Sequence, residues 1–179
     1  MEYIEGSPVT RFCEEHALTL RQRIELFIRI CEGVQHAHHK GVVHRDLKPG
    51  NILVDEIDGR PLPKIIDFGI ATVASRAAGT TRPERAGTPE YMSPEQADGD
   101  AAAVDTRSDV YSLGVVLYEL LTGSRPAAMG ETFLRTSTTL RVPSEKLGTL
   151  PHADAEKLAR KHGLSLAGMR RVLRGELDW

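Results

Sequence analysis

The sequence predicts an α+β fold that is mostly α-helical and carries one small β-hairpin. Apolar residues recur at helical spacing after Thr19 and again after Ser108. Between these stretches, residues 52–54 and 64–66 are short β-prone runs on either side of a turn-rich segment, 55–63. With 179 residues, 40% of them hydrophobic, the chain is long enough to bury one core, so we expect a single domain.

The first helix has a clear start and a clear end in the sequence. Thr19 and Gln22 have the spacing of a capping box, and Gly41 offers a stop. The apolar residues between them share one helical face: Ile24, Phe27, Ile28, Cys31 and Val34. The pattern predicts an amphipathic helix that ends shortly before the hairpin.

The second helix is predicted to be buried. Ser108 can cap it, Gly123 can end it, and residues 115–121 are apolar nearly all round. Before it, residues 71–94 are small, polar and without periodicity, and a loop of that length usually has a function. After it, residues 124–150 read as irregular.

The end of the chain is predicted to form two short helices. They cover residues 153–162 and 166–173, and Gly163 separates them. The segment also has the small-residue and apolar spacing of a helix-turn-helix, in which three arginines could contact DNA phosphates: Arg170, Arg171 and Arg174. Because no linker precedes it, we favour a helical insert and keep DNA binding as the lesser alternative.

Charge and cysteine content limit the partners and the compartment. The net charge is only −2, from 23 Lys and Arg against 25 Asp and Glu, which gives no electrostatic reason to expect a nucleic acid or an anionic membrane. Cys13 and Cys31 have no metal-ligand spacing and read as reduced thiols. No apolar run approaches the roughly 18 residues of a membrane span. We therefore expect a cytoplasmic protein with no membrane segment in this chain.

Four motifs carry the chemistry. Residues 44–51 read HRDLKPGN and residues 67–69 read DFG, followed by GTPEYMSPE at 87–95 and DVYSLG at 109–114. In this order and spacing they resemble the catalytic loop and the later motifs of protein kinases, most closely the bacterial serine/threonine kinases. The resemblance is strong up to about residue 126 and looser beyond it.

The resemblance implies the C-terminal lobe of the protein-kinase fold, with the N-terminal lobe absent. Residues 1–179 would then be a partial kinase domain. Residues 1–6 would be a remnant of the hinge, 7–126 the core of the catalytic lobe, and 127–179 an incomplete helical insert late in the lobe. We expect such a chain to be marginally stable and to have little or no kinase activity alone.

The same resemblance assigns the groups that transfer phosphate from ATP to a protein hydroxyl. Asp46 would accept the proton of the substrate hydroxyl, and Lys48 would place a cation on the transferring phosphate. Asn51 and Asp67 would hold Mg²⁺, because this ion prefers carboxylate and amide oxygens. With Lys48, they would form the phosphate end of the ATP site.

The adenine end of that site is assigned by position. Leu53 matches the apolar residue beneath the adenine ring in the family. Glu2 and Ile4 match the hinge, whose backbone binds adenine.

Regulation and substrate class follow from two further features of the family. Arg45 matches an arginine that pairs with a phosphate on the long loop, since a guanidinium can bind phosphate through two parallel hydrogen bonds. Ser75, Thr80 and Thr81 are the candidate phosphate acceptors. Thr88, in the substrate-binding segment, resembles the serine/threonine branch, so we expect protein substrates with Ser or Thr hydroxyls.

One alternative to catalysis concerns the whole chain, and further expectations concern the histidines and Asp109. A non-catalytic, pseudokinase-like interaction module remains an alternative, because the resemblance leaves the chain without the N-terminal lobe. The three histidines before residue 40, His36, His38 and His39, read as a solvated helix end rather than a metal site. Asp109 is expected to hydrogen-bond the backbone of the catalytic loop.

Overall fold

The structure is a computed structural model, and it describes residues 5–68, 88–99, 103–126 and 141–178. The helices of this part are α1 (Val9–Glu15), α2 (Leu20–His39), α4 (Pro94–Ala97), α5 (Thr106–Thr122), α6 (Pro143–Thr149), α7 (His152–Lys161) and α8 (Leu166–Val172). The strands are β1 (Ser7–Pro8), β2 (Ile52–Ile57) and β3 (Arg60–Ile65). Short 3₁₀ turns cover Pro49–Asn51 and Pro89–Tyr91, and a π-helical turn covers Leu173–Leu177. The predicted mostly helical fold with a small sheet is confirmed.

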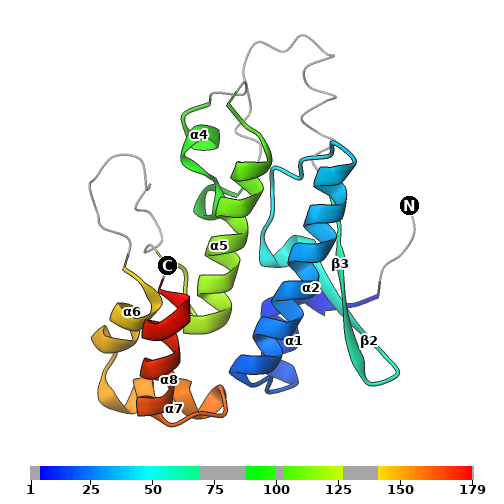
Figure 1. The fold of residues 1–179 in the computed structure, drawn as a ribbon. Coiled ribbons are helices and arrows are strands. Elements are labelled where there is room, and N and C mark those ends of the chain that lie inside the picture. Colours follow the sequence, from blue (N-terminus) through cyan, green and yellow to red (C-terminus); the bar gives the residue numbers. More distant parts are fainter. Residues whose placement is uncertain (1–4, 69–87, 100–102, 127–140, 179) are drawn as a thin grey trace.

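Helix α2 begins where the capping box predicted. The Thr19 hydroxyl accepts the backbone N–H of Gln22 at 3.4 Å, and Gln22 Oε1 accepts the backbone N–H of Thr19 at 2.9 Å. These two bonds satisfy donors that have no partner inside the first helical turn. The helix buries Leu26, Ile30 and Val34 and lies beside α5 (Figure 1).

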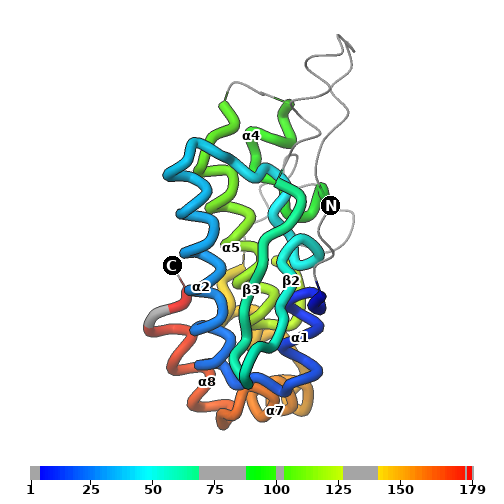
Figure 2. The backbone as a smooth tube through the Cα atoms, turned by 90° about the vertical axis from the view of Figure 1, so that its right-hand side faces the viewer, coloured from blue at the N-terminus to red at the C-terminus, as the bar shows by residue number. Residues whose placement is uncertain are grey.

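The sheet has the order β1-β2-β3 with antiparallel neighbours, and β3 lies alongside α2 (Figure 2). The predicted hairpin is present, but its strands are longer than expected. The turn contains only Asp58 and Gly59, with φ values of 52° and 72°, which suit a two-residue hairpin turn. Pro61 and Pro63 lie on β3, an edge strand, where a residue without an N–H is tolerated.

Helix α5 is buried as predicted, but its cap was predicted wrongly. The cap is Asp105, whose side chain accepts the backbone N–H of Arg107 at 2.7 Å, and not Ser108. Ser108 lies in the first turn and donates to Glu95 Oε1 at 2.5 Å. The helix ends at Gly123, whose φ of 72° is the left-handed conformation that glycine favours.

Two apolar clusters form the core of the described residues. The first joins α1, α2, β2 and α5 and includes Leu26, Ile30, Leu47, Ile52 and Val116. The second joins the start of α2 and the end of α5 to the last helices and includes Leu20, Leu121, Leu147, Ala159, Met169 and Leu173. The C-terminal helices are therefore packed on the rest of the fold and do not stand apart from it.

The C-terminal segment contains one helix that the sequence did not predict. Helix α6 lies within the stretch that read as irregular, and it starts at Pro143, a residue suited to the first position of a helix. Helices α7 and α8 match their predictions to within one residue. In the described part of the chain, no helix is long and apolar enough to cross a membrane.

Candidate active site

The carboxylate of Asp46 lies at the centre of the site. Lys48 Nζ donates to its Oδ2 at 2.8 Å, and the backbone N–H of Thr88 donates to its Oδ1 at 3.0 Å. Asn51 Nδ2 donates to the same Oδ2 at 3.1 Å and to the backbone carbonyl of Asp46 at 2.8 Å. A carboxylate can accept about four hydrogen bonds, so these three donors leave capacity for one more. That remaining capacity suits a substrate hydroxyl.

Lys48 connects two parts of the site. Its ammonium contacts Asp46 and also donates to Thr88 Oγ1 at 2.7 Å. The side chains of Lys48 and Asp46 are 29% and 26% exposed, so their ion pair is only partly screened by water. The ion pair of Lys48 and Asp46 is thereby hydrogen-bonded to Thr88, 40 positions after Lys48 in the sequence.

Asp109 holds the backbone of the catalytic loop, as expected. Its Oδ2 accepts the N–H of His44 and its Oδ1 accepts the N–H of Arg45, both at 2.8 Å. The carboxylate is 1% exposed, so water cannot replace these bonds. They also support Arg45 in its left-handed backbone conformation, with a φ of 69°, which a side-chain-bearing residue rarely adopts.

His38 was wrongly predicted to lie at a solvated helix end. Its Nε2 donates to Asp109 Oδ2 at 2.7 Å, and its side chain is 15% exposed. His36 and His39 are exposed, in agreement with the prediction. The sequence offers one signal for this contact: a buried aspartate at the start of α5 needs more than two hydrogen-bond donors. The sequence does not identify the residue that supplies the third donor.

His44 ties the catalytic loop to the segment that leads to Asp67. The ring is fully buried; its Nε2 donates to the carbonyl of Ile66 at 2.9 Å and its Nδ1 accepts the N–H of Asp46 at 3.2 Å. Its centroid lies 4.8 Å from that of the Phe68 ring. These partners place a proton on Nε2 and leave Nδ1 as an acceptor.

The two candidate metal ligands enter the site from the same end of the hairpin, one from each strand. Asn51 precedes β2, Asp67 follows β3, and the N–H of Ile66 donates to the carbonyl of Asn51 at 3.0 Å. Because Asn51 uses its amide N–H groups on Asp46, its Oδ1 is left as an oxygen ligand. Asp67 is exposed and has a φ of 57°. Amide and carboxylate oxygens suit Mg²⁺, although the described residues contain no cluster of three His, Cys, Asp or Glu side chains that could hold a metal alone.

The start of the described chain passes close over Leu53. A methyl group added at Gly6 would lie 3.0 Å from the carbonyl oxygen of Val54 and 3.3 Å from Leu53 Cβ. Only glycine fits such an approach, and its φ of 148° also disfavours other residues. Glu2 and Ile4, predicted at the adenine end of the site, lie outside the described residues.

Of the candidate regulatory residues, the structure describes Arg45 but not the three candidate phosphate acceptors. Ser75, Thr80 and Thr81 lie outside the described residues. Arg45 is half-buried, and its backbone carbonyl accepts Gln96 Nε2 at 2.6 Å, a contact that the sequence did not predict. Its buried Nε has no hydrogen-bond partner among the described residues. A half-buried guanidinium with a buried, unpaired N–H donor is suited to an anion.

The chain was compared with known proteins. A model of the protein kinase domain matches residues 1–157. Serine/threonine-protein kinase PknB of Mycobacterium tuberculosis is 41% identical over 129 residues, which are 70% of this chain and 20% of that protein. Serine/threonine-protein kinase Pkn1 of Myxococcus xanthus is 41% identical over 128 residues, 70% of this chain and 18% of that protein. The PknB of Bifidobacterium longum is 36% identical over 158 residues, 84% of this chain and 22% of that protein.

The domain match includes the residues that surround Asp46. It extends from the first residue into α7, and it covers the catalytic loop, the hairpin and α5. The chain spans about a fifth of the length of these curated relatives. The chain therefore belongs to the protein kinase family, among the bacterial serine/threonine kinases.

Proposed function

We propose that this chain supplies the catalytic residues for transfer of the γ-phosphate of ATP to serine or threonine hydroxyls of proteins. The observation that carries the proposal is the convergence of Lys48, Asn51 and Thr88 on the carboxylate of Asp46. The base Asp46, the cation Lys48 and the substrate-binding segment at Thr88 therefore lie within hydrogen-bonding distance of one another. Phosphoryl transfer needs little else from a protein than positioned groups and neutralised charge.

Asp46 acts as the base in this proposal. Its remaining acceptor capacity orients the substrate hydroxyl, and it takes the proton as the oxygen attacks phosphorus. Lys48 stays beside the same oxygen and stabilises the negative charge that develops on the transferring phosphate. Thr88 fixes Lys48 and supports the assignment to the serine/threonine branch.

ATP and Mg²⁺ are the proposed cofactors. Asn51 Oδ1 and the Asp67 carboxylate would hold the ion, with water and phosphate oxygens as its other ligands, and the bound ion would neutralise phosphate charge. Lys48 would contact the phosphates. Leu53, with Glu2 and Ile4 at the start of the chain, would hold adenine, and the close passage of Gly6 over Leu53 supports this arrangement.

Regulation is proposed to act through Arg45. A phosphate on Ser75, Thr80 or Thr81 would bind its guanidinium, which has a buried Nε without a partner among the described residues. Because Arg45 precedes Asp46 and shares the contacts of Asp109, such binding would stabilise the catalytic loop.

The fold proposed for the chain is the C-terminal lobe of a kinase. Residues 7–126 would be its catalytic core, 1–6 the hinge segment and 127–179 a helical addition. Burial of Ala155, Ala159 and Met169 in the second core favours the helical addition over a DNA-binding unit. The cytoplasmic location and the absence of a nucleic-acid partner stay predictions.

The experiment that tests the function uses a chimera. Residues 1–126 replace the matching segment of the kinase domain of the Mycobacterium tuberculosis relative, and transfer of labelled phosphate to a protein substrate is measured. We expect the chimera to be active, and Asp46→Asn to lower kcat by about 10²- to 10⁴-fold, the usual contribution of a general base. The native chain is assayed beside it.

The control is Asp58→Asn, the same chemical change at the exposed hairpin turn, which should leave kcat unchanged. Circular dichroism establishes that each variant is folded. A folded chimera that is inactive, or one whose kcat does not respond to Asp46→Asn, would contradict the proposed role.

A further inference from the structure

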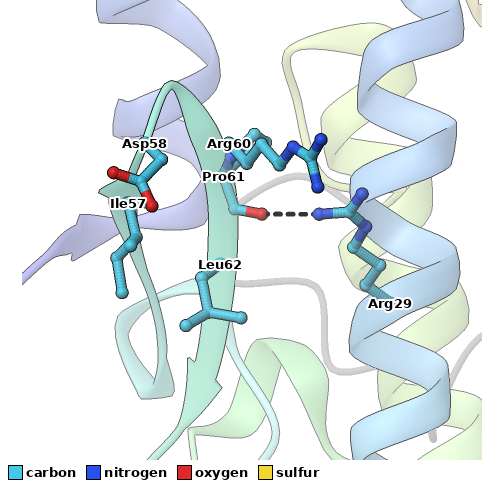
Figure 3. Close-up of a pocket in the computed structure, with 6 residues that line it drawn as sticks. All are labelled: Arg29, Ile57, Asp58, Arg60, Pro61 and Leu62. Carbon is cyan, nitrogen blue, oxygen red and sulfur yellow. Dashed lines mark hydrogen bonds between the residues drawn. The ribbon is translucent and has the colours of Figure 1, made fainter.

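Two arginines face one another over an open pocket beside the tip of the hairpin (Figure 3). The pocket has a volume of about 530 Å³ and is lined by Arg29 of α2 and by the hairpin residues Ile57, Asp58, Arg60, Pro61 and Leu62. Figure 3 shows the guanidinium groups of Arg29 and Arg60 pointing toward one another. Two like charges in this arrangement repel unless an anion lies with them.

Arg29 is held in place without being neutralised. It donates to the carbonyl of Pro61 at 2.9 Å, which fixes the guanidinium against the hairpin and leaves most of its N–H donors free. Among the described residues, neither Arg29 nor Arg60 forms an ion pair, and Figure 3 shows the carboxylate of Asp58 pointing away from both. Two other nearby carboxylates have their own cations, Glu25 with Arg21 and Asp55 with Lys64, and Glu56 lies 3.5 Å from the ring of His16.

Apolar surface continues from the two arginines. Ile57 and Leu62 both line the first pocket and are 47% and 42% exposed, so they offer apolar area to a ligand there. A second pocket of about 340 Å³ shares Arg29 and Pro61 with the first, but its lining includes the polar residues Gln22, Glu25 and Glu56. The exposed apolar side chains beside the two arginines are therefore those of the first pocket, Ile57 and Leu62.

We propose that the first pocket binds a phosphorylated peptide segment of a partner protein. The phosphate would lie between Arg29 and Arg60, and the flanking apolar side chains would cover Ile57 and Leu62. A phosphate ester carries a charge of about −1.5 to −2, which matches two guanidiniums better than a single carboxylate does. The planar fork of each guanidinium can also bind two phosphate oxygens at once, and arginine clusters are a common means of recognising phosphorylated peptides.

The position of the site makes it a docking site and not part of the transfer site. Asn51 and Asp67 flank one end of the hairpin, whereas Arg60 follows the turn at the other end. A six-residue strand spans roughly 17–20 Å, so a phosphate held by Arg60 cannot also reach Asp46. A phosphorylated partner bound here would be kept beside the protein while Asp46 remains free.

The test is a binding measurement with the full chain, and it does not depend on kinase activity. The probe is a fluorescent phosphothreonine peptide library with apolar residues around the phosphothreonine, and the same library without phosphate. Fluorescence anisotropy at low ionic strength should detect binding of the phosphorylated library. We expect the double variant Arg29→Gln, Arg60→Gln to weaken it at least about tenfold, as loss of charge-assisted bonds to phosphate requires.

The matched control is Arg170→Gln with Arg171→Gln, which removes the same charge from two exposed arginines of α8. It should bind like the native chain, and both double variants should keep the native circular dichroism. Equal binding by the two variants, or equal binding of the two libraries, would overturn the proposal. So would a result in which inorganic phosphate competes as strongly as the phosphopeptides, because an anion site alone would then explain the binding.

Discussion

His38 donates a 2.7 Å hydrogen bond to the carboxylate of Asp109, 71 positions further along the chain. The bond links the last turn of α2 to the first turn of α5. The same carboxylate accepts two backbone N–H groups of the catalytic loop, so His38 supports the loop without contacting it directly. The effect of losing His38 should therefore appear first in the stability of this junction.

We expect His38→Ala to lower the free energy of unfolding by about 1.5–3 kcal/mol, the usual contribution of a hydrogen bond to a charged group. The loss arises because Asp109 is 1% exposed and water cannot easily replace the missing donor. Urea unfolding followed by circular dichroism measures it. The control is His39→Ala, an exposed neighbour, for which a change within about 0.5 kcal/mol is expected. Equal effects of the two changes would show that the bond contributes nothing.

Arg23 is predicted to be the most sensitive charged residue. It is 3% exposed, and its guanidinium donates to the carbonyls of Leu18, Leu120 and Cys13 and to the carboxylate of Glu14. Arg23→Met would fill the space but remove all four hydrogen bonds and leave the carboxylate of Glu14 without this cation, although the carbonyl of Cys13 keeps the N–H of Leu18. The change should lower the free energy of unfolding by about 3–5 kcal/mol. Thermal unfolding measures the loss.

Arg21→Met is the matched control for Arg23, because Arg21 lies on the exposed face of the same helix and, among the residues that the structure describes, bonds only Glu25. We expect a much smaller loss there, because exposed ion pairs contribute little to stability. Arg23→Lys should lie close to Arg23→Met, since one ammonium cannot reach four acceptors in different directions. If Arg23→Lys is as stable as the native protein, the positive charge of Arg23 contributes more to stability than the several N–H donors of its guanidinium.

Local signals predicted the ends of the helices where a side chain near in sequence makes the cap. Thr19 and Gln22 set the start of α2, and Gly123 sets the end of α5. The hairpin shows the limit of such signals. Asp58 and Gly59 are a strong two-residue turn signal, but Pro61 and Pro63 suggested a longer turn, because only the sheet order reveals that β3 is an edge strand.

The candidate site shows the same division between near and distant partners. Asp46, Lys48 and Asn51 are neighbours in one loop, and their contacts agree with the motif that they form. The contacts of His38 with Asp109 and of Gln96 with the carbonyl of Arg45 join residues 71 and 51 positions apart. No local pattern marks such pairs, because they depend on how α2, α4 and α5 pack.

The stability of the chain should fall in mild acid because of His162. The ring is 1% exposed, and burial, together with the charge of Arg23, lowers its pKa from 6.5 to about 4. Its Nε2 donates to the carbonyl of Leu121 at 2.9 Å, and its buried Nδ1 has no partner among the described residues. A second proton would thus have to lie on a buried nitrogen without an acceptor.

The sign of this pH dependence follows from proton binding. Between pH 4 and 6.5 the unfolded chain protonates His162 and the folded chain does not, so the free energy of unfolding decreases as the pH falls through this window. The full difference corresponds to about 3 kcal/mol. Urea unfolding at several pH values measures it for the native chain and for His162→Gln, which can keep the bond to Leu121 and does not titrate. Identical slopes for the two proteins would exclude His162 as the cause.

The last prediction concerns the bond from Lys48 to Thr88. Thr88→Val removes the acceptor at 2.7 Å with little change of shape, so Lys48 loses one of the two partners that fix its ammonium. In the active chimera we expect kcat to fall by about tenfold, the equivalent of one hydrogen bond of about 1.4 kcal/mol, with the KM for ATP nearly unchanged. Thr88→Ser retains the hydroxyl and should restore kcat. If Thr88→Ser is as slow as Thr88→Val, the methyl group of Thr88, and not its bond to Lys48, is what the reaction needs.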